Sequence, residues 1–315
     1  MIQEAGMFRI RVPASTANLG PGFDSIGLAL NLYLEVYGSL SDKWEITPLT
    51  EDMKQFPADE TNFIVQIAMK TAAFYGKELP PCRLFVSSEI PLARGLGSSA
   101  SAIVAGIELA DTALALHLSA EEKSRHASSF EGHPDNAGAS VFGGLVVGYH
   151  AADYTKVIHF PVEDLAVMAV IPDFELLTED SRNVLPAHLT YQDAIRGSAA
   201  SNLLVAAAMT NDWSILGKMM QRDPYHQPYR ARLVPHLRKA EEIAGICGAY
   251  GTALSGAGPT VLSLVEENRT ETLKHSFEKA FPSYDIRRLG VDNIGSQVSV
   301  LSSEEFSALD FSMLR

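Results

Sequence analysis

The spacing of hydrophobic positions changes several times along the first half of the chain, from the alternation of strands to the three- and four-residue spacing of helices. A helix is predicted over residues 62–75, and a second helix over 98–117 follows a loop at 91–97. Strands are predicted over four segments, 8–12, 30–38, 82–90 and 143–150. Because strands and helices mix in this irregular order, the pattern predicts an α+β fold.

The second half of the chain follows a polar, turn-like segment at 151–156, beyond which an apolar run over 165–171 starts a new strand pattern. We therefore expect two domains, over residues 1–155 and 156–315, and the length of 315 residues favours the same number. The elements predicted for the second domain are helices over 191–209 and 233–247, a glycine-rich hairpin over 252–265, and a final helix followed by a strand.

Composition narrows the class of protein. The chain has 25 Lys and Arg against 38 Asp and Glu, and the net charge of −13 argues against nucleic-acid or membrane partners. Arg9 and Arg11 interrupt any leader-like apolar segment, and glycines break the uncharged stretch over 243–265, so neither a signal peptide nor a membrane-spanning helix is expected. Cys82 and Cys247 form no disulfide framework or zinc pattern, which indicates a cytoplasmic protein.

The first chemical signal lies where the helix at residue 98 begins. Gly95 and Gly97 let backbone N–H groups approach a ligand, and a helix N-terminus adds partial positive charge, so a phosphate group suits this loop. The alternative is a plain strand-to-helix loop with Ser98 as the N-cap. Gly95, Gly97 and Ala100 also satisfy the dinucleotide pattern G-x-G-x-x-A, but the acidic strand end that a nicotinamide dehydrogenase requires is missing. No Walker A loop or nucleophile elbow is present.

Two further glycine-rich segments have the composition of loops that shape pockets. The first, residues 13–24, contains Asn18 and ends on Asp24, whose carboxylate is suited to orient or polarise a substrate hydroxyl. The alternative is a turn in which Asp24 bonds its own backbone. The second, residues 254–261, allows close approach of a ligand at two glycines, and its alternative is a tight hairpin.

Carboxylates and isolated arginines complete the set of candidate residues. Glu131 and Asp135 lie close together in the sequence, and carboxylates near a phosphate loop suit Mg²⁺. The alternative is a capped loop between a helix and a strand, with His133 in a structural role. Arg182 and Arg230 are candidate bidentate anchors for a carboxylate, or else solvated surface arginines.

The order of these segments resembles the three motifs of the GHMP small-molecule kinases. The chain carries Pro-Ala-Ser-Thr-Ala-Asn-Leu-Gly-Pro-Gly-Phe-Asp at 13–24, Pro-Leu-Ala-Arg-Gly-Leu-Gly-Ser-Ser-Ala at 91–100 and Ser-Gly-Ala-Gly-Pro-Thr at 255–260. The first motif, with Glu-Gly-His-Pro-Asp-Asn and Pro-Tyr-Arg elsewhere, is similar to the homoserine kinase branch. The resemblance covers almost the whole chain. It implies a ribosomal S5-like N-terminal domain, a ferredoxin-like C-terminal domain and an active site in the cleft between them.

The resemblance implies ATP as a substrate, with its triphosphate along the glycine loop, and Mg²⁺ held by Ser99 and Glu131. Asn62 corresponds to a contact on the adenine side. The ATP- and phosphate-binding residues that it implies are Pro91, Leu92, Ala93, Arg94, Gly95, Leu96, Gly97, Ser98, Ser99, Ala100, Ser101, Asn62, Gly256 and Gly258.

The resemblance implies L-homoserine as the acceptor, in a reaction of threonine biosynthesis, and it also allows a homodimer. Asp135 corresponds to the partner of the α-ammonium group, and Arg182 and Arg230 to the partners of the α-carboxylate. The substrate-binding residues that it implies are Asn18, Asp24, Asp135, Thr178, Arg182 and Arg230.

The implied catalytic residues are Asp24, Asn18 and Asn136. Asn136 stands near the position where related kinases have a base-like Asp, so a dedicated general base is not expected and Asp24 is expected to orient the hydroxyl. Phosphoryl transfer through a loose transition state depends mainly on positioning and charge stabilisation. The alternatives are a GHMP kinase for another small alcohol, such as mevalonate or shikimate, and a catalytically silent relative that senses a nucleotide or metabolite.

Overall fold

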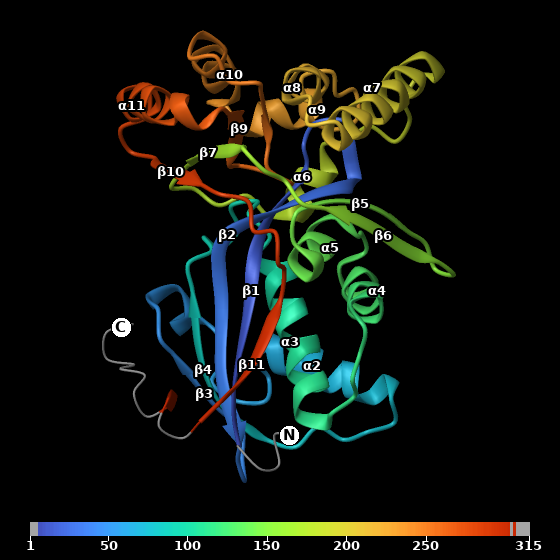
Figure 1. The fold of residues 1–315 in the computed structure, drawn as a ribbon, viewed down its shortest axis with the longest axis vertical. Coiled ribbons are helices and arrows are strands. Elements are labelled where there is room, and N and C mark those ends of the chain that lie inside the picture. The colour runs from blue at the N-terminus through green and yellow to red at the C-terminus, as the bar shows by residue number, and fades with distance from the viewer. Residues whose placement is uncertain (1–5, 303–304, 307–315) are drawn as a thin grey trace.

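A long hairpin formed by β1 (Met7–Asn18) and β2 (Gly22–Leu40) runs through the lower half of the molecule in Figure 1. The structure, a computed structural model, describes residues 6–302 and 305–306. Apolar side chains at alternate positions of β1, such as Phe8 and Ile10, are fully buried. The strand periodicity of the sequence thus places one face of the hairpin in the core.

Within the described residues, seven strands form the first sheet, in the order β11-β1-β2-β4-β3, with β5 paired to β2 and β6 paired to β5. Only the pairing of β3 with β4 is parallel among these strands. The remaining strands of this sheet are β3 (Glu45–Pro48), β4 (Cys82–Ser88), β5 (Leu145–His150), β6 (Thr155–Phe160) and β11 (Gln297–Leu301).

Helices α2 to α5 lie together beside the first sheet (Figure 1). Their bounds are α2 (Phe63–Phe74), α3 (Ser98–Leu114), α4 (Ala120–Glu131) and α5 (Asp135–Phe142), and a 3₁₀ helix η1 (Glu51–Gln55) precedes them. Gly106 allows α3 to lie against α2, because a Cβ atom there would be 2.7 Å from the carbonyl oxygen of Ile64. A capping box between Ser119 and Glu122 begins α4.

The second domain has a four-stranded antiparallel sheet in the order β10-β7-β9-β8, with helices gathered above it in Figure 1. Its strands are β7 (Ala166–Ile171), β8 (Gly251–Leu254), β9 (Val261–Val265) and β10 (Asp285–Leu289). Its helices are α6 (Thr178–Asn183), α7 (Tyr191–Met209), α8 (Trp213–Met220), α9 (Gln227–Arg230), α10 (Leu237–Ile246) and α11 (Thr270–Ala280), with 3₁₀ helices η2 (Ala231–Leu233) and η3 (Glu267–Arg269).

The predicted α+β elements are confirmed, but three local interpretations, one of them an alternative, do not hold. The segment 151–156, expected to separate the domains, contains the turn of the β5–β6 hairpin, so a boundary at residue 155 cuts a hairpin of the first sheet. Strand β11 also returns to the first sheet from the far end of the chain. The segment 13–24 is mostly strand, and residues 131–136 join two helices rather than a helix and a strand. No helix in the described part of the chain is long and apolar enough to cross a bilayer.

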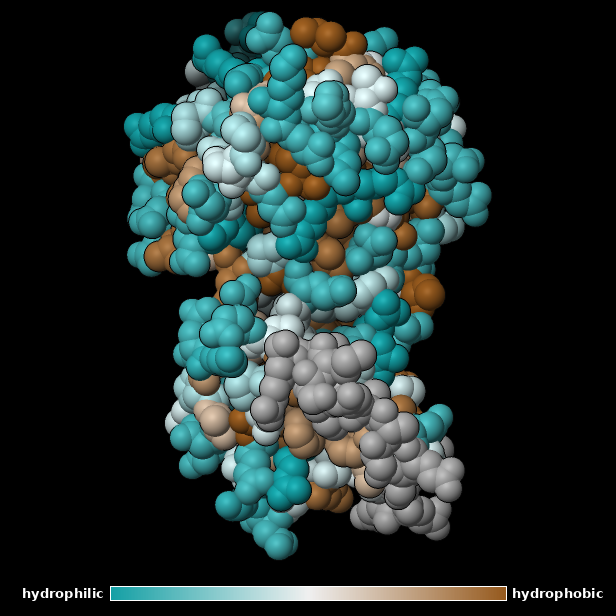
Figure 2. All heavy atoms as spheres, turned by 90° about the vertical axis from the view of Figure 1, so that its left-hand side faces the viewer, coloured by the Kyte–Doolittle hydropathy of each residue, from teal (hydrophilic) through white to brown (hydrophobic). Residues whose placement is uncertain are grey.

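The tip of the β1–β2 hairpin reaches the second domain and fixes the active-site loops against each other. The amide of Asn18 donates to the carbonyl of Gly256 at 3.0 Å, and the N–H of Gly256 donates to the carbonyl of Ala17 at 3.1 Å. His226 Nε2 lies 3.0 Å from the carbonyl oxygen of Gly20. These contacts cross the narrow waist between the domains that Figure 2 shows.

Candidate active site

The glycine loop ends in a helix N-terminus that is free to bind an anion. Gly97 is the N-cap residue of α3, with φ of 73°, and its position offers no side-chain acceptor to the first N–H groups of the helix. The alternative, in which Ser98 is the N-cap, therefore does not hold, since Ser98 is already the first helical residue. Unpaired N–H groups and the helix dipole both favour a bound phosphate at this point.

Gly95 holds the loop against the turn between β8 and β9. Its φ is 76°, and a Cβ atom there would lie 2.3 Å from the carbonyl oxygen of Ser255 and 2.7 Å from that of Gly258. The hydroxyl of Ser255 donates to the carbonyl of Gly95 at 2.5 Å. The glycine is thus required both by its conformation and by the close approach of another backbone.

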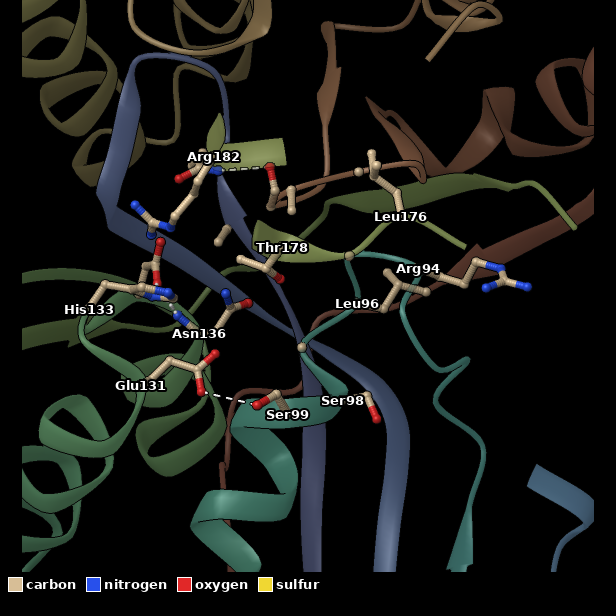
Figure 3. Close-up of a pocket in the computed structure, with 18 of the residues that line it drawn as sticks. Arg94, Leu96, Ser98, Ser99, Glu131, His133, Asn136, Leu176, Thr178 and Arg182 are labelled. Atoms are coloured by element: carbon tan, nitrogen blue, oxygen red, sulfur yellow. Dashed lines mark hydrogen bonds and ion pairs between the residues drawn. The ribbon is translucent and has the colours of Figure 1, made fainter. Parts of the chain in front are cut away.

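Ser99 and Glu131 face each other across the loop (Figure 3). The hydroxyl of Ser99, in the first turn of α3, donates to Oε2 of Glu131, the last residue of α4, at 3.3 Å. Burial raises the pKa of Glu131, against the opposing effect of nearby positive charge. A hydroxyl and a carboxylate beside a phosphate-binding helix end form an oxygen donor set of the kind that Mg²⁺ prefers.

An apolar cavity of about 400 Å³ opens on one side of the glycine loop. Ala93, Ser98 and Ser99 border both this cavity and the polar pocket described below, so the loop separates the two. The apolar side chains that line the cavity include Ile46, Met53, Phe56, Phe63, Val86 and Ala102. A mostly apolar cavity of this size is suited to a flat ring system.

The polar pocket on the other side of the loop contains two arginines and a carboxylate. Arg182 forms a bidentate ion pair with Asp24, with N–O distances of 2.8 and 3.0 Å. Arg230 is only 2% exposed, and its Nε and Nη1 donate to the carbonyls of Ser181 and Gly256. Burial, and then the charge of Arg182, lower the pKa of Arg230 to about 10. Arg230 therefore remains protonated near neutral pH.

Asp135 also lines this pocket. Its Oδ1 atom lies 2.6 Å from Nδ1 of His133 and accepts the N–H of Asn136 at 2.7 Å, so both contacts use one oxygen. Burial lowers the pKa of His133, but its hydrogen bond with Asp135 and the negative charges of the nearby carboxylates together raise the pKa overall. Asn136 accepts a hydrogen bond from Ser15 through Oδ1 at 3.0 Å, and its Nδ2 has no partner among the described residues.

Most of the predicted site residues converge on these two cavities, but several use their side chains elsewhere. The guanidinium group of Arg94 points away from the pocket in Figure 3 and donates to the carbonyls of Leu92, Pro172 and Asp173. Pro91 lines the groove on that outer side. Arg94 thus ties the glycine loop to the chain that leaves β7 instead of presenting its charge to the pocket.

Three other predicted residues also use their side chains in hydrogen bonds within the protein. Asn18 is 3% exposed and uses its amide to bind Gly256 and the N–H of Asp24. Asn62 borders the apolar cavity as the N-cap of α2, accepting from the N–H of Ile64 and donating to the carbonyl of Pro57. The remaining one, Ser101, is buried and donates to the carbonyl of Ser98.

The sequence did not single out the residues that orient Arg230. His226 is fully buried, and burial followed by the charge of Arg230 lowers its pKa to about 3, so it stays neutral. Its Nδ1 lies 3.3 Å from Nη1 of Arg230, and its ring stacks on Phe23 at 5.2 Å. Asp223 accepts the N–H groups of Tyr225 and Gln227 and so begins α9. The signal in the sequence that could have indicated this contact is the four-residue spacing of His226 and Arg230, because residues four apart are neighbours on a helix.

Two family models match this chain. The model of the GHMP kinases N terminal domain matches residues 62–144, and the model of the GHMP kinases C terminal domain matches residues 204–283. Together they cover part of each domain, including the glycine loop and the acidic residues beside it. The chain therefore belongs to the GHMP kinases.

More detailed similarity comes from individual relatives. Homoserine kinase of Bacillus velezensis is 53% identical over 93% of this chain and 94% of its own length, and that of Halalkalibacterium halodurans is 47% identical over 95% and 97%. The crystal structure of homoserine kinase from Cytophaga hutchinsonii superposes with a TM-score of 0.84 at 28% identity and covers 94% of this chain and 98% of that one. Within the GHMP kinases, the chain belongs to the homoserine kinase family.

Proposed function

We propose that this protein transfers the γ-phosphoryl group of ATP to the side-chain hydroxyl of L-homoserine, a step of threonine biosynthesis in the cytoplasm. The observation that carries the proposal is the polar pocket beside the glycine loop. It offers Arg182 and Arg230 to a carboxylate and Asp135 to an ammonium group within one enclosure. Groups of opposite charge within one pocket select a zwitterionic amino acid over an alcohol that lacks either charge.

The two cavities suggest how both substrates bind. The adenine ring suits the apolar cavity, and the triphosphate suits the N–H groups at the start of α3, which adjoin it. The acceptor then lies in the polar pocket with its hydroxyl toward the loop. Holding the reacting groups in this orientation is a large part of the catalysis, because the entropy of bringing them together is lost on binding.

Ser99 and Glu131 are the residues that would hold Mg²⁺. The metal supplies positive charge to the phosphate oxygens when bound. The protein itself adds the dipole of α3 and, beside the pocket, the free Nδ2 donor of Asn136. The carboxylate of Asp24 is paired with Arg182 in this structure, and we expect no dedicated base. Asp24 is therefore assigned to orient the hydroxyl.

A coupled ADP-release assay tests the proposal. With ATP and Mg²⁺, we expect turnover of L-homoserine to exceed that of L-serine, L-threonine, mevalonate and shikimate at matched concentrations. Replacing Arg182 with alanine is expected to lower kcat/KM for homoserine by about 1000-fold, since loss of one charged partner leaves the carboxylate poorly bound.

The matched control for that variant is Arg196→Ala, which removes an exposed arginine of α7 outside the pocket. It should leave turnover unchanged. Turnover of mevalonate or shikimate in place of homoserine would support the assignment as a kinase and overturn homoserine as the acceptor. An absence of turnover with every alcohol, combined with ATP binding, would indicate a nucleotide sensor.

The rate should also depend on pH through Glu131. Because burial raises the pKa of this carboxyl, it takes up a proton at a higher pH than an ordinary glutamate, and the protonated form cannot bind a cation. We expect kcat/KM for ATP to fall as the pH decreases, with a midpoint above the ordinary glutamate value of about 4.3. A pH–rate profile measured on the wild type and on Glu131→Gln checks this, since the variant should lose that acidic limb.

A further inference from the structure

Asp24 and Arg182, which both line the polar pocket, form an ion pair with each other. Both side chains are partly exposed to the pocket, at 35% and 39%, and both oxygens of Asp24 accept hydrogen bonds from Arg182. Parallel bonds of this kind are the arrangement that a guanidinium group makes with any carboxylate, including that of an amino acid. Asp24 therefore occupies, in the free protein, a position suited to the carboxylate of an acceptor.

The backbone fixes Asp24 in this position. Its φ of 54° lies in the left-handed region, and its N–H donates to the side chain of Asn18 at 3.1 Å. Asn18, with φ of 75°, is itself bound to the second domain through Gly256. A non-glycine residue in this conformation is held there by its surroundings, so the pairing is built into the hairpin.

The second arginine explains why the pocket needs an anion. The guanidinium carbons of Arg182 and Arg230 lie 5.6 and 5.2 Å from the same ring, that of Phe23. Nη2 of Arg230 has no hydrogen-bond partner among the described residues, while its other nitrogens are satisfied. The two positive charges thus converge on one space, and in the free protein the carboxylate of Asp24 provides the negative charge there.

We propose that Asp24 is a specificity-determining residue: the acceptor's carboxylate displaces it from Arg182, and only the displaced Asp24 can orient the acceptor hydroxyl. This inference rests on the proposed function. It makes the carboxylate a condition for turnover and not only for binding. An acceptor without a carboxylate leaves Asp24 held by Arg182, so that its side chain cannot turn toward the hydroxyl, even when the pocket is saturated.

The surroundings allow the displacement. Besides Arg182, the charged or titratable groups near Asp24 are Arg230, His133 and Asp135, and the ligand atoms of His133 and Asp135 lie with those of Asp24 within 4.8 Å of one another. His133, whose Nδ1 atom is bonded to Asp135, offers a polar side chain to a released Asp24 carboxylate on that side of the pocket. The acceptor's ammonium group adds a positive charge there.

A first experiment measures binding of a carboxylate probe by calorimetry. 4-Hydroxybutyrate carries the carboxylate and hydroxyl of homoserine but no ammonium group. In Asp24→Asn the probe no longer competes with a charged side chain, so we expect its Kd to fall by about fivefold relative to wild type. Asp180→Asn, on the same helix as Arg182 but with no ion pair among the described residues, is the matched control and should leave Kd unchanged.

Arg182→Ala distinguishes displacement from a general charge effect. The tighter binding caused by Asp24→Asn should vanish when Arg182 is also replaced. The same improvement with and without Arg182, or an unchanged or higher Kd in Asp24→Asn, would overturn the proposal. In steady-state assays Asp24→Asn should lower both KM for homoserine and kcat, the latter by about tenfold, whereas damage to the fold would raise KM.

A second experiment needs no variant. The acceptor 3-amino-1-propanol is homoserine without its carboxylate, and wild type should phosphorylate it slowly even at saturation. Added acetate should increase its turnover by about tenfold, because acetate takes the place of the missing carboxylate on Arg182. Equal turnover with and without acetate, at concentrations where chloride has no effect, would contradict the proposal.

The results of these experiments distinguish a failure of the displacement from a failure of the proposed function. Failure of wild type to phosphorylate homoserine would overturn that function, while the calorimetry with 4-hydroxybutyrate would still decide whether a carboxylate displaces Asp24. Conversely, an active homoserine kinase whose Asp24→Asn variant gains no affinity for the probe would keep the function and overturn the displacement.

Discussion

Glu131→Gln is expected to lower kcat/KM for ATP by about 100- to 1000-fold, since the change removes the negative charge that faces the phosphate loop while keeping the shape of the side chain. Glu131 lies at the end of α4, opposite the hydroxyl of Ser99 at 3.3 Å. A glutamine can still accept that hydrogen bond, so the fold should persist. The measurement is the coupled assay at several Mg²⁺ concentrations, where the variant should require more Mg²⁺ to reach half its maximal rate.

The control for this prediction is Glu121→Gln, which removes a carboxylate at the exposed start of the same helix. It should change neither the rate nor the Mg²⁺ dependence. Binding of homoserine, measured separately, should be unchanged in Glu131→Gln, because Arg182 and Arg230 provide the carboxylate site. A variant that keeps its rate within about threefold of wild type would show that Glu131 does not hold the cation.

Gly95→Ala is expected to reduce kcat/KM for ATP by about 100-fold or more, because a methyl group displaces the loop that holds the phosphates. Left-handed backbone costs an alanine about 1–2 kcal/mol. The methyl group would also lie 2.3 Å from the carbonyl oxygen of Ser255, a backbone atom that cannot rotate away. We expect most of this reduction to come from a higher KM for ATP, and we also expect a lower melting temperature.

Gly76→Ala separates the two causes. Gly76 also has a positive φ, of 63°, but nothing lies within 4 Å of the added methyl group. This variant should show a similar backbone cost in its melting temperature and normal activity. If Gly95→Ala were no less active than Gly76→Ala, the close approach of Ser255 to the loop would have no part in binding ATP.

Much of the secondary structure could be predicted from the sequence, because it depends on interactions between neighbouring residues. The helix over 191–209 and the strand pattern at 8–12 follow from periodicity, which needs only neighbouring residues. The error at residue 155 arose because a polar turn inside a hairpin has the same composition as a linker. The return of β11 to β1 involves residues nearly 300 positions apart, as in the pairing of Phe8 with Val300, and no local pattern indicates it.

The sequence by itself determined where the helix after the glycine loop begins and which segments carry the glycines and charged residues of the candidate site, because these depend on short motifs. Only the tertiary structure decided how those residues are used. It paired Asp24 with Arg182 across 158 positions, turned Arg94 away from the pocket, and occupied the amide of Asn18 with Gly256. Such choices depend on which polar groups meet when the two domains pack, and burial requires each to find its partner there.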